Sequence, residues 1–320
     1  MKEKAIGKGW LAAHAGDLLS YGGLVLCLIV FSVLSQGRLW SAYNIRILIQ
    51  AVCVYAILSL GAVFIYSMGY MDISVGAQVG VYCILCILTT NATGSLLAGF
   101  LVILGLALVC GLINGYVSVM LGLPSIVTSI FLSSIFGGAQ VLLMERVGIN
   151  SVSIEADVSF FKDTKVMVAA IVIIALIALY LYNFTQLGKY IKGIGANETA
   201  TKYSGVSTTK WKVFAYAFFG ICVAIAAFFL TARTGAAGKG TGTGYAMDIM
   251  VALLLGGMPL SGGMRSRVSK AVVGAFTFSL LEVGLPLIGV PNEMTFFVKA
   301  IIFIIVVLIT CRKHSGTLPR

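Results

Sequence analysis

The chain is a succession of long apolar runs separated by short polar or glycine-rich connections. Most runs approach the roughly 20 apolar residues that one helix needs to cross the hydrocarbon core of a membrane. They are continuous and lack the period-two alternation of a membrane β-barrel strand. The pattern therefore predicts an all-α, polytopic membrane helix bundle with about ten transmembrane helices in a single domain, residues 1–320. The predicted spans are 18–36, 45–68, 74–90, 95–119, 125–143, 166–186, 211–232, 246–262, 269–288 and 294–311.

Composition agrees with a membrane environment. Hydrophobic residues make up 59% of the 320 residues and charged residues 10%, whereas a soluble domain has roughly 25% charged residues. The net charge of +11 comes mainly from Lys and Arg between the apolar runs, where they set topology. We therefore expect membrane lipid, and no nucleic acid, around this chain.

Lys and Arg are distributed unevenly between the two sets of connections. If the N-terminus is inside, fourteen lie in the inside connections and at the adjoining span ends, against seven on the outside. This bias predicts a multi-pass protein with the N- and C-termini both in the cytoplasm. The outside connection 144–165 also carries acidic residues, as a translocated loop does.

No residue pattern indicates a catalytic or metal site. The seven cysteines lie inside or at the ends of apolar runs, so the Cys83–Cys86 pair is interpreted as packing. The two histidines lie near the termini, which argues against a histidine-based site. The stretch 235–241 resembles a phosphate loop, but Arg233 stands where that motif needs glycine. We therefore predict no enzyme activity, no cofactor and no metal.

The first motif of interest is GYMDISVG, residues 69–76, which brings Asp72 and Ser74 to the start of the third run. One interpretation is a helix cap, because Asp at a helix N-terminus accepts backbone N–H groups. The other is a carboxylate beside a translocation path. Both interpretations place Asp72 at a break between two helices.

The second motif is GTGYAMDIMVALLLGGMPLSGG, residues 242–263, with Asp248 near its start and Gly256 and Gly257 near its end. Glycines within a span allow close helix approach or a broken helix at a pathway. Asp248 has the same two interpretations, a helix cap or a pathway carboxylate.

The two motifs belong to a candidate inverted repeat. GYMDISV (69–75) corresponds to GYAMDIMV (244–251), and GLPSIV (122–127) corresponds to GLPLIGV (284–290). Each match is offset by five spans, and an odd offset reverses membrane orientation. The prediction is an inverted repeat of helices 2–5 and 7–10, an arrangement common in transporters.

Two ionisable residues, Glu282 and Lys299, lie within apolar runs. Charges at such positions are costly and are usually paired or directed toward a cavity. We expect either a structural ion pair across the last two helices or a role for Glu282 in the pathway.

The connection 187–212 is the most polar one on the inside. Within it, Gly195, Asn197 and Glu198 indicate a turn into a short helix. One interpretation is a solvated basic loop. The other is a docking helix for a cytoplasmic partner, which is favoured by the unusual length of this inside connection and mostly by the family resemblance given below.

Four stretches together resemble the permease subunits of bacterial ATP-binding-cassette sugar importers of the ribose type. The resemblance covers roughly residues 44–309 and departs from the family at Ala246-Met247 and Met258-Pro259, which leaves the substrate open. The stretches are GYMDISVG (69–76), GLINGYVSVMLGLPSIVTSI (111–130), LGKYIKGIGANETATKYSGV (187–206) and GTGYAMDIMVALLLGGMPLSGG (242–263).

This resemblance implies a permease in the bacterial cell membrane that carries a monosaccharide inward. It also implies three partners: a separate ATPase subunit, an extracytoplasmic substrate-binding protein and a second permease subunit, identical or related. Residues 187–212 would form the cytoplasmic coupling loop. Glu198 would cap or position the docking helix, and Lys202 and Tyr203 would line the contact with the ATPase. Other positions that match the motifs are Gly195, Asn197 and Gly205 in the loop, and Gly111, Asn114, Gly115 and Pro124 near the path.

Two other functions remain open on the residues alone. A self-sufficient, ion-coupled secondary transporter would also explain an inverted repeat and the charges at Glu282 and Lys299. A membrane scaffold without transport activity would also explain a docking loop. Stoichiometric copurification of an ATPase subunit, together with ATP-dependent uptake, distinguishes the importer from both.

Overall fold

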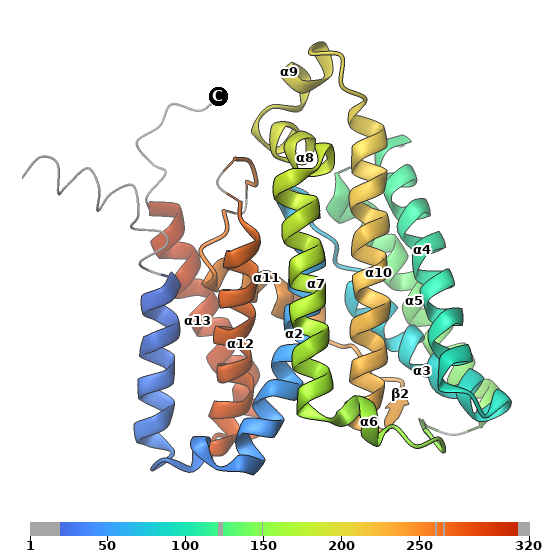
Figure 1. The fold of residues 1–320 in the computed structure, drawn as a ribbon, viewed down its shortest axis with the longest axis vertical. Helices are drawn as coiled ribbons and strands as arrows, with labels where there is room; N and C mark the ends of the chain where they lie inside the picture. The colour runs from blue at the N-terminus through green and yellow to red at the C-terminus, as the bar shows by residue number, and fades with distance from the viewer. Residues whose placement is uncertain (1–19, 121–123, 149, 260, 265, 313–320) are drawn as a thin grey trace, which may run out of the picture.

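The computed structural model describes residues 20–120, 124–148, 150–259, 261–264 and 266–312 (Figure 1). The elements are an unlabelled helix Ser20–Leu34, η1 (Arg38–Trp40), α2 (Ala42–Tyr66), α3 (Val75–Thr93), α4 (Leu96–Met120), α5 (Ser125–Val147), β1 (Ser151–Ser153), α6 (Ser159–Lys162), α7 (Thr164–Phe184), α8 (Gln186–Ala196), α9 (Glu198–Tyr203), α10 (Thr208–Thr234), β2 (Ala236–Gly238), α11 (Tyr245–Leu255), α12 (Val268–Leu287) and α13 (Asn292–Arg312).

The predicted polytopic helix bundle is confirmed, whereas the number of ten spanning helices is not. Among the described residues, seven helices are long and apolar enough to cross a membrane: α2, α3, α4, α5, α7, α10 and α12. The helix Ser20–Leu34 and α11 are apolar but shorter. The predicted eighth span, 246–262, is wrong as a continuous helix, because α11 ends at Leu255 and Gly257 takes a left-handed φ of 77°.

Two short strands qualify the all-α prediction. β1 pairs antiparallel with β2, with Ser151 opposite Gly238 and Ser153 opposite Ala236. The connection 144–165, which was expected to be a plain loop, therefore contributes β1 and the short helix α6. The sheet ties this connection to the end of α10 and lies at the opposite end of the bundle from α8 and α9 (Figure 1).

The core is built around α2. Its residues from Gln50 to Tyr66 are all buried, because α7, α10, α11 and α12 pack around it. By contrast, α4, α5 and α7 turn many apolar side chains outward. An apolar exterior is stable in lipid and costly in water, so this distribution places the outer helices against the membrane.

Helices α4 and α10 approach closely along a line of small residues. A Cβ atom added at Gly111 would lie 2.7 Å from the Tyr216 carbonyl oxygen, and one at Gly115 would lie 2.9 Å from the Val213 Cα. On the facing side, a Cβ at Gly220 would lie 2.5 Å from the Ala107 carbonyl oxygen. Small residues four positions apart are typical of tightly packed membrane helices.

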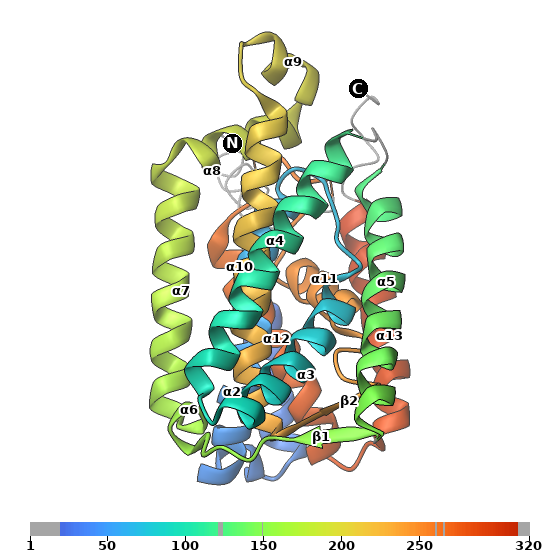
Figure 2. The same cartoon turned by 90° about the vertical axis from the view of Figure 1, so that its right-hand side faces the viewer.

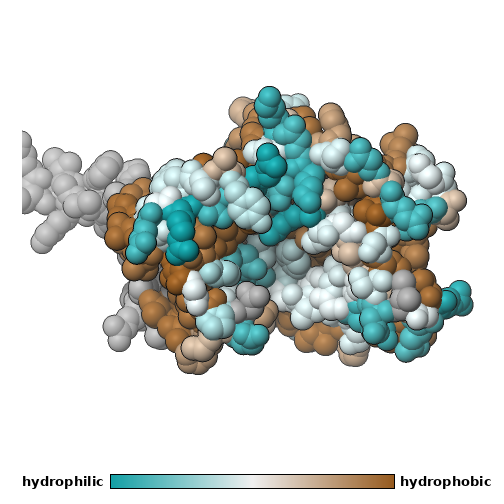
Figure 3. All heavy atoms as spheres, turned by 90° about the horizontal axis from the view of Figure 1, so that it is seen from below, coloured by the Kyte–Doolittle hydropathy of each residue, from teal (hydrophilic) through white to brown (hydrophobic). Residues whose placement is uncertain are grey.

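The helix Ser20–Leu34 begins near mid-height of the bundle, and α13 ends toward the side that carries α8 and α9 (Figure 1). At the opposite end, polar residues gather over the middle and apolar residues form much of the rim (Figure 3). The two motif-bearing helices run in opposite directions, because α3 follows the ascending α2 and α11 follows the descending α10 (Figures 1 and 2). This is the relation that an inverted repeat requires; the repeat itself stays a prediction.

Candidate functional site

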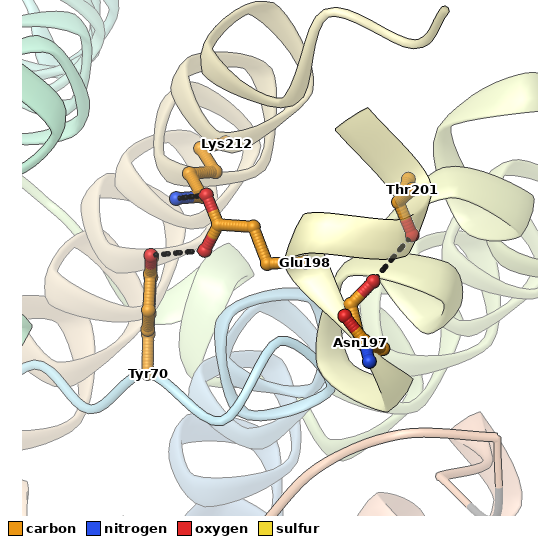
Figure 4. Close-up of polar contacts among 5 residues, drawn as sticks. All are labelled: Tyr70, Asn197, Glu198, Thr201 and Lys212. Atoms are coloured by element: carbon orange, nitrogen blue, oxygen red, sulfur yellow. Dashed lines mark hydrogen bonds and ion pairs between the residues drawn. The ribbon is translucent and has the colours of Figure 1, made fainter. Parts of the chain in front are cut away.

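The polar connection 187–212 consists of helices rather than loop. α8 follows α7 after the extended residue Thr185, and a turn at Asn197 leads into the short helix α9 (Figure 4). The Asn197 side-chain oxygen accepts a hydrogen bond from the Ala200 N–H at 2.9 Å, which is an N-terminal cap. Asn197, and not Glu198, is therefore the capping residue of the predicted docking helix.

Glu198 positions α9 against the helix bundle. One of its carboxylate oxygens forms an ion pair with Lys212 of α10, and the other accepts a hydrogen bond from the Tyr70 hydroxyl at 3.2 Å (Figure 4). The Lys212 ammonium is buried and lies 4.9 Å from the centre of the Tyr70 ring. Because Tyr70 belongs to the GYMDISVG motif, this cluster connects the first motif with the predicted docking helix.

The side chains predicted to meet the ATPase lie on the outer surface. Lys202 and Tyr203 are both exposed, and Tyr203 is 87% exposed. Gly205 follows with a left-handed φ of 82°, a conformation that favours glycine, and allows the chain to turn into α10. The geometry leaves Lys202 and Tyr203 accessible to a partner, and no interaction within the described residues requires Tyr203.

α8 and the end of α7 are anchored to the end of α2 and to the connection before α12. A Cβ at Gly195 would lie 1.9 Å from the Ser67 carbonyl oxygen, so only glycine fits there. The Tyr182 hydroxyl shares a 2.6 Å hydrogen bond with the Ser67 hydroxyl and donates to the Ser266 carbonyl at 3.1 Å. Lys192 of α8 stacks over the Tyr182 ring, and burial, followed by the nearby positive charge of Arg267, lowers its pKa.

Asp72 lies fully inside the bundle, held by neutral donors. One carboxylate oxygen accepts the backbone N–H of Ser74 at 2.8 Å and the Ser74 hydroxyl at 2.5 Å. The other accepts the Asn114 side-chain amide at 2.8 Å. The first pair folds the chain just before α3, but it is not the predicted helix cap, because Ser74 is the N-cap residue of α3 and Asp72 lies two residues before it. The second adds a link to α4.

A chain of hydrogen bonds continues from Asp72 into α3. Gln78 donates to the Ser74 hydroxyl at 2.7 Å, and the Tyr82 hydroxyl donates to the Gln78 amide oxygen at 3.2 Å. The Ser125 hydroxyl accepts from the Met71 N–H at 3.1 Å. Ser125 is the first residue of α5 and follows Pro124, which is itself exposed. The first motif thus joins α3, α4 and α5 through polar contacts.

Asp248 has different partners and is not a helix cap. Its carboxylate accepts a hydrogen bond from the Tyr55 hydroxyl of α2 at 3.3 Å and lies 3.7 Å from the Lys299 ammonium of α13. Lys299 also forms an ion pair with Glu282 of α12. The predicted Glu282–Lys299 pair is present, and Asp248 makes it a three-membered charge network that joins four helices.

The two motifs meet at their glycines. A Cβ at Gly76 would lie 2.5 Å from the Gly242 carbonyl oxygen, and one at Gly242 would lie 2.0 Å from the Gly76 carbonyl oxygen. At the other end of the second motif, a Cβ at Gly256 would lie 1.9 Å from the Lys270 carbonyl oxygen, and Gly257 accepts a hydrogen bond from the Lys270 ammonium at 3.1 Å. Gly256 and Gly257 therefore serve close packing of α11 on α12.

The sequence did not single out several residues that complete these sites. From the sequence, Tyr70 stood out only as a member of the GYMDISVG motif, and Lys212 only as one of the positive charges that predict topology. Tyr55 did not stand out. Their partners come from other helices, 128 positions away for Tyr70 and Glu198 and 193 positions away for Tyr55 and Asp248. The only available signal was that Lys212 begins an apolar run, where a buried charge needs a partner.

Comparison with known proteins agrees with this architecture of a membrane permease. A family model described as "Branched-chain amino acid transport system / permease component" matches residues 44–307. The chain belongs to this family of permease components. No solved structure matches it at a significant level.

Curated relatives align over most of the chain. The ribose import permease protein of Escherichia coli K12 is 26% identical over 93% of this chain and 95% of its own length. The galactofuranose transporter permease protein of the same strain is 32% identical, over 88% of this chain and 83% of its own length. The xylose transport system permease protein of Haemophilus influenzae is 27% identical, over 87% and 92% respectively.

Proposed function

We propose that this chain is the permease subunit of an ATP-binding-cassette importer that carries a monosaccharide across the bacterial cell membrane into the cytoplasm. The observation that carries the proposal is the cluster of Glu198, Lys212 and Tyr70, which links the exposed helix α9 to the first motif. A partner that pushes or pulls on α9 would act through this cluster on the segment that holds Asp72.

Because the chain belongs to a family of permease components, we infer that other subunits supply the energy and deliver the solute. A separate ATPase subunit supplies the energy, and an extracytoplasmic binding protein delivers the solute. The ATPase would bind the end with α8 and α9, and the binding protein would bind the polar surface at the other end (Figure 3). A second permease subunit, identical or related, completes the assembly. The sugars named for the relatives differ, so we propose the class of monosaccharide and not one member.

Tyr203 offers the sharpest test of coupling. Because its side chain is 87% exposed, Tyr203→Ala removes no internal packing, so a change in coupling reports on the partner. We expect the variant to insert and fold normally, to retain less ATPase subunit on purification, and to lose ATP-dependent sugar uptake in proteoliposomes. The matched control is Tyr43→Ala, since Tyr43 is 72% exposed at the opposite end of the bundle.

A second variant acts on the shape of α9. Ala200→Pro removes the N–H that Asn197 caps, so α9 should lose its structure while the spanning helices remain. ATP hydrolysis should continue without uptake. Wild-type uptake by both Tyr203→Ala and Ala200→Pro would refute the coupling role of α9.

The charges in the membrane favour one alternative, an ion-coupled secondary transporter, because Asp248, Glu282 and Lys299 lie together inside the bundle. Uptake into proteoliposomes that contain only this chain separates the two functions. A subunit of an importer gives no uptake under an ion gradient and requires the ATPase and ATP. Gradient-driven uptake by the chain alone would refute the importer.

A further inference from the structure

The outer surface of the bundle has a groove of about 640 Å³ that none of the sites above uses. Figure 2 shows its setting: α7 and α4 lie on either side of α10, and α8 crosses near the upper end of α7. Its volume falls within the roughly 300–1,000 Å³ typical of small-molecule sites. The lining residues include Leu108 and Leu112 of α4, Leu181 of α7, Leu187 of α8, and Phe214 and Phe218 of α10.

The groove is apolar throughout except at one point. Lys210 lines it, together with Trp211. The Lys210 ammonium lies 5.6 Å from the centre of the Trp211 ring and 5.9 Å from that of Phe214. Within the part of the chain that the structure describes, Lys210 pairs with no carboxylate. The groove thus presents one cation beside an otherwise hydrocarbon surface.

The positions of Lys210 and Trp211 are those of residues at a membrane interface. Both lie in the first turn of α10, next to the polar segment that contains α9. The Trp211 ring packs on Tyr190 of α8 at 5.0 Å between ring centres. α8 is amphipathic and buries Leu187, Gly188, Ile191 and Ile194 on one side. Trp, Tyr and Lys gather where the acyl chains end and the headgroups begin.

We propose that this groove binds an anionic phospholipid of the surrounding membrane. One acyl chain lies along the leucines and phenylalanines between α4 and α7, and the phosphate meets Lys210 beside Trp211. The cation selects an anionic headgroup, and the apolar walls of the groove hold the chain more closely than a flat helix surface does. The proposal rests on the placement of these helices in a membrane and not on the transported solute.

Trp211 provides a direct measurement. The chain has three tryptophans, Trp10, Trp40 and Trp211, so a Trp10→Phe/Trp40→Phe background leaves a single reporter in the groove. This protein is reconstituted in nanodiscs of phosphatidylcholine containing a small fraction of lipid with brominated acyl chains, either phosphatidylglycerol or phosphatidylcholine. We expect brominated phosphatidylglycerol to quench Trp211 fluorescence more strongly, at equal mole fraction.

Two variants assign the preference to the groove. In the single-tryptophan background, Lys210→Glu should reduce the relative binding of phosphatidylglycerol roughly fivefold, the equivalent of about 1 kcal/mol for one lysine near the membrane surface. Lys239→Glu, the matched charge control at the other end of the bundle, should leave the relative binding of phosphatidylglycerol unchanged. Leu108→Phe/Leu112→Phe should fill the groove and weaken quenching by both lipids.

Three results would overturn the proposal. Equal quenching by the two brominated lipids would identify ordinary surrounding lipid. An unchanged preference in Lys210→Glu would place the anionic lipid elsewhere. Absence of quenching by either lipid would mean that lipid does not enter the groove. None of these results bears on sugar uptake, so the proposed function stands or falls separately.

Discussion

Asp72 and Asp248 occupy related sequence motifs, yet the protein stabilises their carboxylates in different ways. Among the described residues, the donors to Asp72 are all neutral and come from Ser74 and from Asn114 of α4. Asp248 receives a phenol from α2 and shares the Lys299 ammonium with Glu282. The partners of Asp72 come from the nearby residue Ser74 and from one other helix, α4. The network around Asp248 connects α2, α11, α12 and α13.

The difference shows how a membrane interior tolerates two kinds of acidic site. A buried carboxylate costs several kcal/mol unless its lone pairs are satisfied. Hydrogen bonds from adjacent residues satisfy Asp72 as soon as the start of α3 forms. Asp248 depends on Tyr55 of α2 and on Lys299 of α13, which Glu282 of α12 shares, so its site exists only after α13 packs against α11 and α12. Variants that remove single partners distinguish the two cases.

The largest effect is expected from Lys299→Met. This change leaves two carboxylates close together without their cation, and breaking a buried ion pair by removing one partner costs about 3–5 kcal/mol. Thermal unfolding in detergent should show a large loss of stability. Neutralising all three groups, as Lys299→Met/Asp248→Asn/Glu282→Gln, should recover most of it. If Lys299→Met alone unfolds at the wild-type temperature, the network does not hold α13.

Asp72→Asn comes next. Asparagine keeps the shape of the side chain but replaces one acceptor oxygen with an amino group, which faces the Ser74 or the Asn114 donor. We expect a loss of about 1–3 kcal/mol, the usual cost of a buried polar group without a partner. Exchanging the two residues, as Asp72→Asn/Asn114→Asp, restores a donor–acceptor pair and should recover stability. Failure of the exchange to improve on Asp72→Asn would contradict the pairing.

The smallest effects come from removing a hydroxyl at the edge of each site. Tyr55→Phe removes a 3.3 Å hydrogen bond to a charged group, which we expect to cost about 1.5 kcal/mol. Tyr82→Phe removes a bond of similar length to the neutral Gln78, and about 0.5–1 kcal/mol is expected. The two unfolding temperatures, measured side by side, should fall in that order. The reverse order would mean that the Tyr55 hydroxyl does not stabilise the Asp248 carboxylate.

Much of the fold follows from the sequence because helices in a membrane satisfy their own backbone. The apolar runs predicted the long spans to within a few residues at most ends, as α2 and α4 illustrate. The same rule misled at the eighth run, where apolar residues continue past Leu255 although the helix ends there. Hydropathy indicates whether a segment lies in lipid or in water. It does not indicate whether close packing against α12 interrupts the helix.

The candidate sites were predictable only in part. Asp72, Asp248 and Glu198 were marked by charge at breaks between apolar runs, and the Glu282–Lys299 pair by the cost of isolated charges in lipid. Their partners Asn114, Tyr55 and Lys212 could not be matched to them from the sequence. Hydrogen bonds between distant helices depend on which faces meet, and neither spacing nor hydropathy determines this.

The sequence by itself determined the solvent, the helical class and the positions where polar chemistry interrupts the apolar pattern, because the absence of water in the membrane core forces these features locally. Only the tertiary structure decided which breaks lie together. It joined Glu198 to Tyr70 and Gly76 to Gly242, and it gave two similar aspartates different partners. These contacts arise from packing between helices distant in sequence, where a missing Cβ or a single hydroxyl decides whether two segments meet.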